Sequence, residues 1–361
     1  MRTAIALLAL SAAVSGAPAK HLTKEGRAEL IARAQVWQRT DIASKNLLIG
    51  PGGSGAFSPG QSVPCDYVDK KLTGDTPKFD CRIGADDEVK VKYGGTNGEV
   101  YAEVAATRLL WALGFGADRM YPVAVICRGC PASIVGIRRP DGTLLVDPAS
   151  IERKFDGKEI NKPIDGWSWK ELSLVREDAG GAPRNQIDAL ILLAAFIQHT
   201  DNKPRQQRLV CLGEKPHGDR ANNCAMPFLM INDLGMTFGR ANFLNHNAPG
   251  SMNLDGWSNT PLWKDPVRCV TNLPKSFSGT LDNPQVSEPG RRFLAGLLSQ
   301  LTDAQIHDLF AAARVQLRTR IPDSARSGLP TIDEWVDAFK AKRAQVTEQP
   351  CGQELSTSVR H

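Results

Sequence analysis

The hydrophobic positions along the chain change period between its two halves. From residue 65 to residue 146, apolar and charged residues alternate over short stretches such as EVKVKYG (residues 88–94), which indicates strands. After residue 166 the apolar positions recur at helical spacing, and NQIDALILLAAFIQ (185–198) is apolar enough for a buried helix. The pattern therefore predicts an α+β protein, with strands mainly in the first half of the chain and helices mainly in the second.

Individual elements follow from the same periodicity. We expect strands at 65–83 (strand, turn, strand), 88–94, 119–127, 132–139, 142–146 and 226–230. We expect helices at 20–45, 98–116, 166–175, 185–198 and 290–301, and capping boxes at Thr302–Gln305 and Thr331–Glu334 predict two more. The glycine-rich stretch 47–60 lacks the P-loop spacing, so it is expected to be a flexible surface loop.

The composition is that of a globular protein. The chain has 361 residues, 42% of them hydrophobic, and a net charge of +5. That length is enough for one large core or two smaller ones. The sequence contains no block of lysines and arginines, so a nucleic-acid partner is not expected.

The first residues predict a secretory signal peptide. Met1-Arg2 is a short positive start, an apolar run follows at residues 4–14, and Ala17-Pro18-Ala19 fits an A-x-A cleavage site. Cleavage is expected between Gly16 and Ala19, with export to the periplasm or the extracellular space. No other stretch is expected to be an integral membrane segment.

The cysteine count fits export. An even number in an exported chain predicts disulfides, and the eight cysteines are Cys65, Cys81, Cys127, Cys130, Cys211, Cys224, Cys269 and Cys351. Cys211 and Cys224 flank one polar excursion and are expected to pair, and Cys65–Cys81 is a further expected pair. Cys127-Arg-Gly-Cys130 could be redox-active or half of a metal site. Because no second C-x-x-C or nearby histidine pair completes such a site, a structural disulfide is favoured.

Two polar stretches follow apolar elements. HTDNKPRQQ (199–207) ends the predicted buried helix and carries Asp201 and Lys203, while INDLG (231–235) ends a predicted strand and carries Asp233. Phosphoryl transfer needs a carboxylate for the attacking hydroxyl, a cation near the phosphate and oxygen ligands for a divalent metal. Taken singly, each aspartate could equally be a turn residue.

Both stretches resemble the protein-kinase pattern H-R-D-x-K-x-x-N followed by D-F-G. The first is closer to atypical kinases of the HipA type and related secreted kinases, whose loop commonly reads N-T-D-x-H-x-x-N. The resemblance implies a two-lobed fold, with an antiparallel-sheet N-lobe and a helical C-lobe. It also implies ATP with Mg²⁺ or Mn²⁺ in the cleft.

Within that resemblance, four residues of the two stretches take roles. Asp201 is the base-like carboxylate, Lys203 contacts phosphate, and Gln206 and Asp233 are the metal ligands. Gln206 replaces the asparagine of the pattern, and its longer side chain displaces the amide oxygen by about one methylene in a metal site that demands near-octahedral geometry.

The resemblance extends upstream to a nucleotide loop. LTGDTPKF (72–79) is similar to the S-G-x-x-P-K loop of HipA-like kinases. Gly74 would allow the backbone to approach a phosphate, and Lys78 could reach one. An ordinary hairpin turn is the alternative.

A strand lysine and a helix glutamate complete the resemblance. Lys92 takes the place of the lysine in V-A-I-K, and Glu103 takes the place of the helix carboxylate that pairs with it. Lys90 and Glu99 are the competing residues, and both are expected to be solvated surface charges.

The expected organisation is a signal peptide (1–19), a helical leader with the glycine-rich loop (20–60), an N-lobe (61–157), a C-lobe (158–346) and a tail (347–361). The function implied is transfer of the ATP γ-phosphate to a hydroxyl of an unknown protein or small molecule. The alternatives are an inactive pseudokinase serving as an envelope binding or scaffold module, and an AMP transferase on the same fold.

Overall fold

The computed structural model describes residues 23–74, 76–160, 166–213, 224–239, 252–277, 279–319 and 328–352. The predicted signal peptide lies outside them. The α-helices are α1 (Lys24–Ala32), α2 (Glu99–Leu113), α3 (Arg184–Phe196), α4 (Leu254–Ser258), α5 (Glu288–Leu298), α6 (Asp303–Ala312) and α7 (Ile332–Thr347). The strands are β1 (Ser62–Val68), β2 (Lys78–Gly84), β3 (Asp87–Tyr93), β4 (Arg119–Arg128), β5 (Ile137–Arg138), β6 (Leu144–Arg153), β7 (Lys158–Glu159), β8 (Gln207–Leu212), β9 (Met226–Ile231), β10 (Trp263–Asp265) and β11 (Val270–Thr271).

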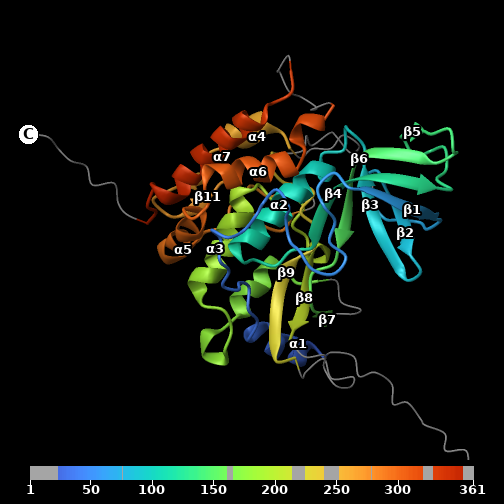
Figure 1. The fold of residues 1–361 in the computed structure, drawn as a ribbon. Helices are drawn as coiled ribbons and strands as arrows, with labels where there is room; N and C mark the ends of the chain where they lie inside the picture. Colours follow the sequence, from blue (N-terminus) through green and yellow to red (C-terminus); the bar gives the residue numbers. More distant parts are fainter. Residues whose placement is uncertain are drawn as a thin grey trace, which may run out of the picture.

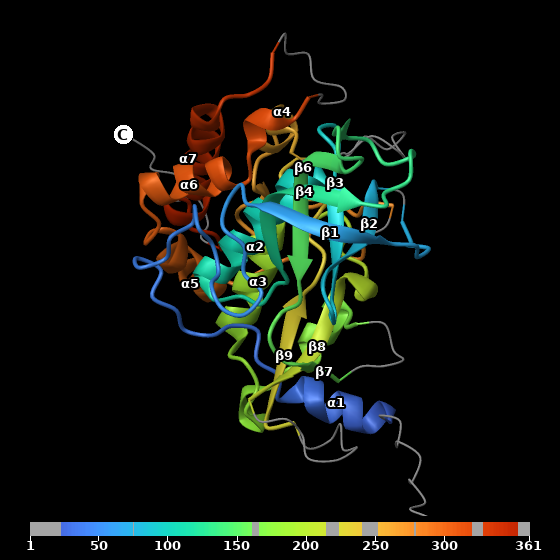
Figure 2. The same ribbon diagram turned by 45° about the vertical axis from the view of Figure 1, so that its right-hand side comes forward.

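The first sheet closes on itself. Its strand order is β3-β2-β1-β4-β6-β5, and β3 also pairs with β6, so five strands form a small barrel (Figures 1 and 2). The resemblance implied an antiparallel sheet, and the pairings are antiparallel except for β1 with β4, which is parallel.

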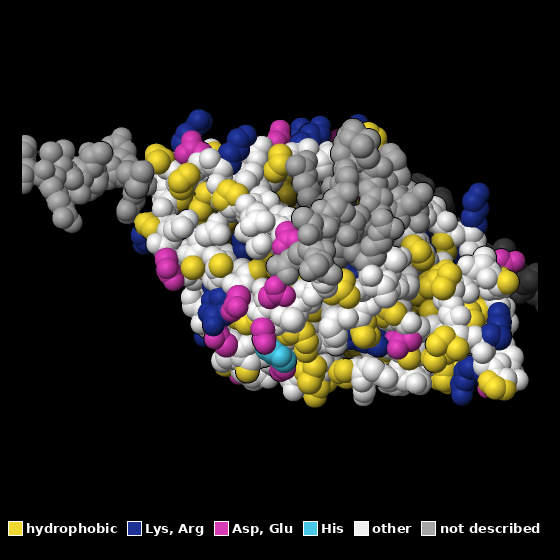
Figure 3. Space-filling view, turned by 90° about the horizontal axis from the view of Figure 1, so that it is seen from above, with side chains coloured by type: hydrophobic (Ala, Val, Ile, Leu, Met, Phe, Trp, Pro, Cys, Tyr) yellow, Lys and Arg dark blue, Asp and Glu magenta, His cyan; other side chains and the backbone are white. Residues whose placement is uncertain are grey.

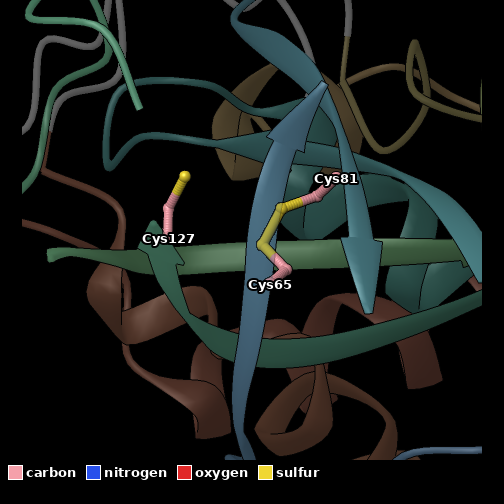
Figure 4. Close-up of side chains that lie close together, drawn as sticks. All are labelled: Cys65, Cys81 and Cys127. Carbon is pink, nitrogen blue, oxygen red and sulfur yellow. A yellow bond between two sulfur atoms is a disulfide. The ribbon is translucent and has the colours of Figure 1, made fainter. Parts of the chain in front are cut away.

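Successive side chains along each strand point alternately to the two faces of the barrel wall. Val89, Val91 and Tyr93 of β3 are buried in an apolar cluster with residues of the other strands, whereas Lys90 and Lys92 lie on the opposite face of β3. Sulfur atoms gather inside the barrel (Figure 4). There the Cys65–Cys81 disulfide joins β1 to β2, and the three sulfurs of Cys65, Cys81 and Cys127 lie within 4.8 Å of one another.

Helix α2 connects the barrel to the helical part of the molecule (Figure 1). It packs against β4 and β6 on one side and α6 on another, so almost every one of its residues is buried. The helix predicted at 98–116 ends at Leu113, because the backbone of Gly114 is left-handed (φ 87°) and its N–H bonds to the last carbonyls of the helix.

The remaining elements form a helical layer and a second small sheet. Strands β7, β8 and β9 are antiparallel, α3 packs against α5, and α7 packs against α5 and α6. Trp257 is fully buried in the core of this layer, among Phe196, Phe238, Phe310, Trp335 and Phe339. Within the described ranges, no helix combines the length and the apolar character that crossing a membrane requires.

Charged side chains of both signs are mixed on the surface. On the face seen in Figure 3, lysine and arginine side chains stand among aspartate and glutamate side chains, with hydrophobic ones between them. Neither sign forms a continuous patch among the described residues of this face, which agrees with the small net charge of +5.

Two local expectations were wrong. The helix predicted at 20–45 ends at Ala32, because Gln35 pairs with Phe228 of β9 instead of continuing the helix. The strand predicted at 132–139 is only two residues long, since the Cys127–Cys130 bridge and a turn precede it. The glycine-rich stretch 47–60 forms a loop, as expected, and the carbonyl of Gly55 accepts a hydrogen bond from Arg153 of the barrel (2.9 Å).

All eight cysteines are paired in the structure. The expected pairs Cys211–Cys224, Cys65–Cys81 and Cys127–Cys130 are present, and a fourth bridge joins Cys269 to Cys351, just past α7. Such pairs are compatible with an oxidising environment.

The Cys269–Cys351 bridge is predicted to stabilise the fold most. It spans 82 residues, against 3 for Cys127–Cys130. Loop-closure entropy makes the longer cross-link worth roughly 3 kcal/mol more. Urea unfolding of Cys269→Ser/Cys351→Ser should therefore show a much larger loss of unfolding free energy than Cys127→Ser/Cys130→Ser. Equal losses would contradict the entropic account.

Candidate active site

One buried ammonium group organises the candidate site. Lys92 Nζ lies 2.7 Å from Glu99 Oε2, 2.7 Å from Glu103 Oε1 and 3.9 Å from Asp233 Oδ1. The lysine side chain is only 5% exposed. The structure thus brings together a strand lysine, two helix glutamates and the aspartate that follows β9.

Local sequence explains why two glutamates meet this lysine. Glu99 and Glu103 are four residues apart, so they lie on one face of α2. Asn97 fixes the short connection from β3, because its amide donates to the Tyr93 carbonyl (3.1 Å) and its side-chain oxygen accepts from the Glu99 N–H (3.1 Å). The expectation that Glu99 is a solvated surface charge was wrong.

The charges in this cluster do not balance, because three carboxylates surround one ammonium. Burial, together with Asp233 and Glu99, raises the pKa of Glu103 well above its usual range despite Lys92. Burial would also raise the pKa of Asp233, but Lys92 and a hydrogen bond from Glu103 outweigh burial and lower this pKa. Glu103 is therefore the more readily protonated of the two carboxyl groups, whereas Lys92 favours the ionised form of Asp233.

The turn after β9 reaches the cluster because Gly235 has no side chain. A Cβ there would stand 2.7 Å from Cγ of Glu99. The Gly235 N–H donates to Asp233 Oδ1 (3.1 Å), which orients the carboxylate toward Lys92. The side chain of Asp233 is 32% exposed, so it also faces solvent.

Asp201 is held by two neighbours in its own loop. Lys203 Nζ lies 2.7 Å and 2.8 Å from the two carboxylate oxygens, and Gln206 Nε2 donates to Oδ2 at 2.8 Å. The Gln206 carbonyl accepts the N–H of Asn232 (2.9 Å), which places this loop directly beside the end of β9.

Asn202 is a structural residue that the sequence did not single out. Its side-chain oxygen accepts the N–H groups of Thr280 (2.5 Å) and Leu281 (2.8 Å), and its amide donates to the His199 carbonyl (2.7 Å). Asn202 thus ties the loop carrying Asp201 to a segment almost eighty residues later. Nothing local to the loop predicts so distant a partner.

Gly74 and Lys78 lie at the entrance to the cluster. Lys78 is the cross-strand partner of Lys92, and a Cβ at Gly74 would stand 2.7 Å from Lys78 Nζ. Partial burial and the charge of Lys92 lower the pKa of Lys78. Lys90 turns away from this group and pairs with Glu152 (2.8 Å).

The oxygen donors present suit a hard divalent cation such as Mg²⁺ or Mn²⁺. Asp233 contributes a carboxylate facing solvent, but Lys92 already occupies the centre of the group formed with Glu99 and Glu103. Because Gln206 donates through its amide nitrogen to Asp201, only its oxygen could serve a metal. Asp233 is therefore the carboxylate of this group with a side open to a cation.

Comparison with known proteins gives little beyond this geometry. No family model and no curated protein matches the chain. Among solved structures, the chain is similar to the Helicobacter pylori proinflammatory kinase CtkA, with a TM-score of 0.44 and 11% identity over 84% of this chain and 100% of that one. A likeness at this level carries no weight for activity, so any functional assignment rests on the geometry of the site.

Removing the central ammonium should destabilise the protein. Lys92→Ala leaves the carboxylates of Glu99 and Glu103 buried without their cation, which costs roughly 3–5 kcal/mol. Lys90→Ala is the matched control on the same strand: Lys90 is partly exposed and Glu152 keeps Lys154, so the loss should stay below about 1 kcal/mol. Denaturant unfolding measures both, and similar losses would contradict the central role of Lys92.

His199 should make stability depend on pH. It is fully buried, and burial lowers its pKa to about 4 although Asp201 and Asp233 act in the opposite direction. Since the unfolded chain binds its proton at about pH 6.5, stability should fall by roughly 3 kcal/mol as pH drops from 6.5 to 4. His199→Leu should lose that part of the pH dependence in unfolding experiments between pH 7 and 4.5. An unchanged pH profile would show that His199 is not buried neutral.

Proposed function

We propose that the protein is a kinase-like phosphotransferase that moves the γ-phosphate of a nucleoside triphosphate, with ATP as the expected donor, to a hydroxyl of a protein or small molecule. The observation that carries the proposal is the Lys92 ammonium, buried between Glu99 and Glu103 and 3.9 Å from Asp233. A lysine fixed this way is a preorganised contact for phosphate oxygens.

The reacting groups can be assigned from the same geometry. Asp201 orients the acceptor hydroxyl and takes its proton as the new oxygen–phosphorus bond forms and the bond from the γ-phosphorus to the bridging oxygen breaks, releasing the diphosphate. Lys203, which contacts both oxygens of Asp201, would contact the transferring phosphoryl group. Lys92 and Lys78 bind the remaining phosphate oxygens.

A divalent cation belongs to this proposal. Asp233 and the amide oxygen of Gln206 would hold it, and when bound it would neutralise charge on the phosphates. Asp233 suits that task because Lys92 keeps it ionised. Export is part of the same proposal, and the four disulfides are compatible with an oxidising compartment.

A catalytically inactive binding module is the second candidate. It is favoured by Gln206, whose amide nitrogen binds Asp201. In this case the fold would bind nucleotide and metal without turnover.

Measuring turnover distinguishes an active phosphotransferase from an inactive binding module. We expect the mature protein with γ-labelled ATP or GTP and Mg²⁺ or Mn²⁺ to release or transfer labelled phosphate, and Asp201→Asn to reduce the rate by at least about a hundredfold while nucleotide still binds. Asp178→Asn changes an exposed acid elsewhere and should leave the rate unchanged.

Two other results would contradict the assignment. An unchanged rate in Asp201→Asn would remove the proton-accepting role of that residue. Transfer of label from the α-phosphate instead of the γ-phosphate would establish nucleotidyl transfer.

A further inference from the structure

A cavity beside the candidate site has a distinctive lining. It has a volume of about 680 Å³ and lies on the outer face of the barrel. The glycine-rich stretch forms one wall through Ser54 and Gly55, and the floor comes from β2, β3 and the end of β6, including Asp80, Lys90 and Glu152. Its size is that of a small-molecule site.

Strand register places this floor next to the Lys92 cluster. Lys78 pairs with Lys92 across β2 and β3, and Asp80 pairs with Lys90 one step further along the same strands. Residues two apart on a strand share a face and are separated by about 7 Å. The cavity is therefore within reach of the nucleoside of a triphosphate held at Lys78 and Lys92.

The cavity offers little apolar surface to a nucleobase. Val89 is the single hydrophobic side chain among the described residues that line it. A flat ring would find no pair of aliphatic or aromatic faces to stack between. Recognition of a base here must come from hydrogen bonds.

The hydrogen-bonding groups that a ligand meets on the floor are mainly ammonium donors. The side chains of Lys70, Lys90 and Lys154 are 56%, 35% and 68% exposed, whereas the carboxylates beneath them are buried, Asp80 at 7% and Glu152 at 6%. Lysine donates hydrogen bonds and cannot accept them. At the rim, the carboxylates of Asp87 and Glu88 pair with Arg153 and Lys70 but are 41% and 37% exposed, so the rim also offers acceptors.

This donor surface distinguishes between the two purines. Guanine presents two neighbouring acceptors, O6 and N7, which are matched by lysine ammonium groups. Adenine places its N6 amino group where guanine has O6. The hydrogen-bond donors of this amino group would therefore face the ammonium donors of Lys90.

We infer that this cavity binds the base of the nucleotide and that Lys90 makes the site prefer a guanine nucleotide to an adenine nucleotide. The inference rests on the proposed function, because it requires the triphosphate to lie at Lys92. It assigns Lys90 as a specificity-determining residue, with Glu152 holding its ammonium in place at 2.8 Å.

Calorimetric titration of the mature protein in excess Mg²⁺ tests the inference. The probes are GTP, ATP and inorganic tripolyphosphate, which has no base. GTP should bind about tenfold more tightly than ATP. In Lys90→Met, which keeps an unbranched apolar side chain and removes the ammonium donors, the affinities for GTP and ATP should come within about threefold of each other. The affinity for tripolyphosphate should stay the same. Lys170→Met, at an exposed lysine outside the cavity lining, is the matched control and should preserve the preference for GTP.

Equal affinities for ATP and GTP in the wild-type protein would overturn the inference and leave the phosphate site intact. Persistence of the preference for GTP in Lys90→Met would remove the role given to Lys90. If tripolyphosphate and both nucleotides all fail to bind, the proposed function itself fails, and the inference with it.

Discussion

The central constraint on this structure is the burial of one ammonium group among three carboxylates. Isolated charges are costly to bury, and Lys92 is tolerated because Glu99 and Glu103 approach it at 2.7 Å. The two glutamates in turn need the lysine, since like charges four residues apart on a helix repel each other. Strand β3 and helix α2 are therefore coupled by electrostatics as well as by packing.

The other parts of the site are arranged around this pair. Asn97 fixes the short connection between β3 and α2, and Gly235 lets the turn carrying Asp233 come against Glu99. The loop carrying Asp201 joins the end of β9 through the bond between Asn232 and Gln206. Each contact is made by a small or amide residue at a loop, so the charged side chains are placed by backbone geometry.

The sequence predicted features that depend on local pattern. Alternation located the strands, helical spacing located α2 and α3, and the resemblance to the kinase pattern singled out Lys92. The sequence could not predict closure of the barrel, because the β3–β6 pairing joins residues about sixty positions apart. For the same reason it missed the bonds from Asn202 to Thr280 and Leu281. The sequence indicates a surface charge at Glu99, because no neighbouring residue shows that Glu99 and Glu103 both face one buried lysine.

The most direct test of the central claim is the thermal unfolding midpoint of the mature, disulfide-intact protein with ATP or GTP and Mg²⁺ or Mn²⁺. A ligand that binds only the folded state raises the midpoint by mass action. A Lys92–Asp233 phosphate site predicts a metal-dependent rise in the wild-type protein that is absent in Asp233→Ala. An equal rise in the variant, or no rise with any nucleotide, would contradict it.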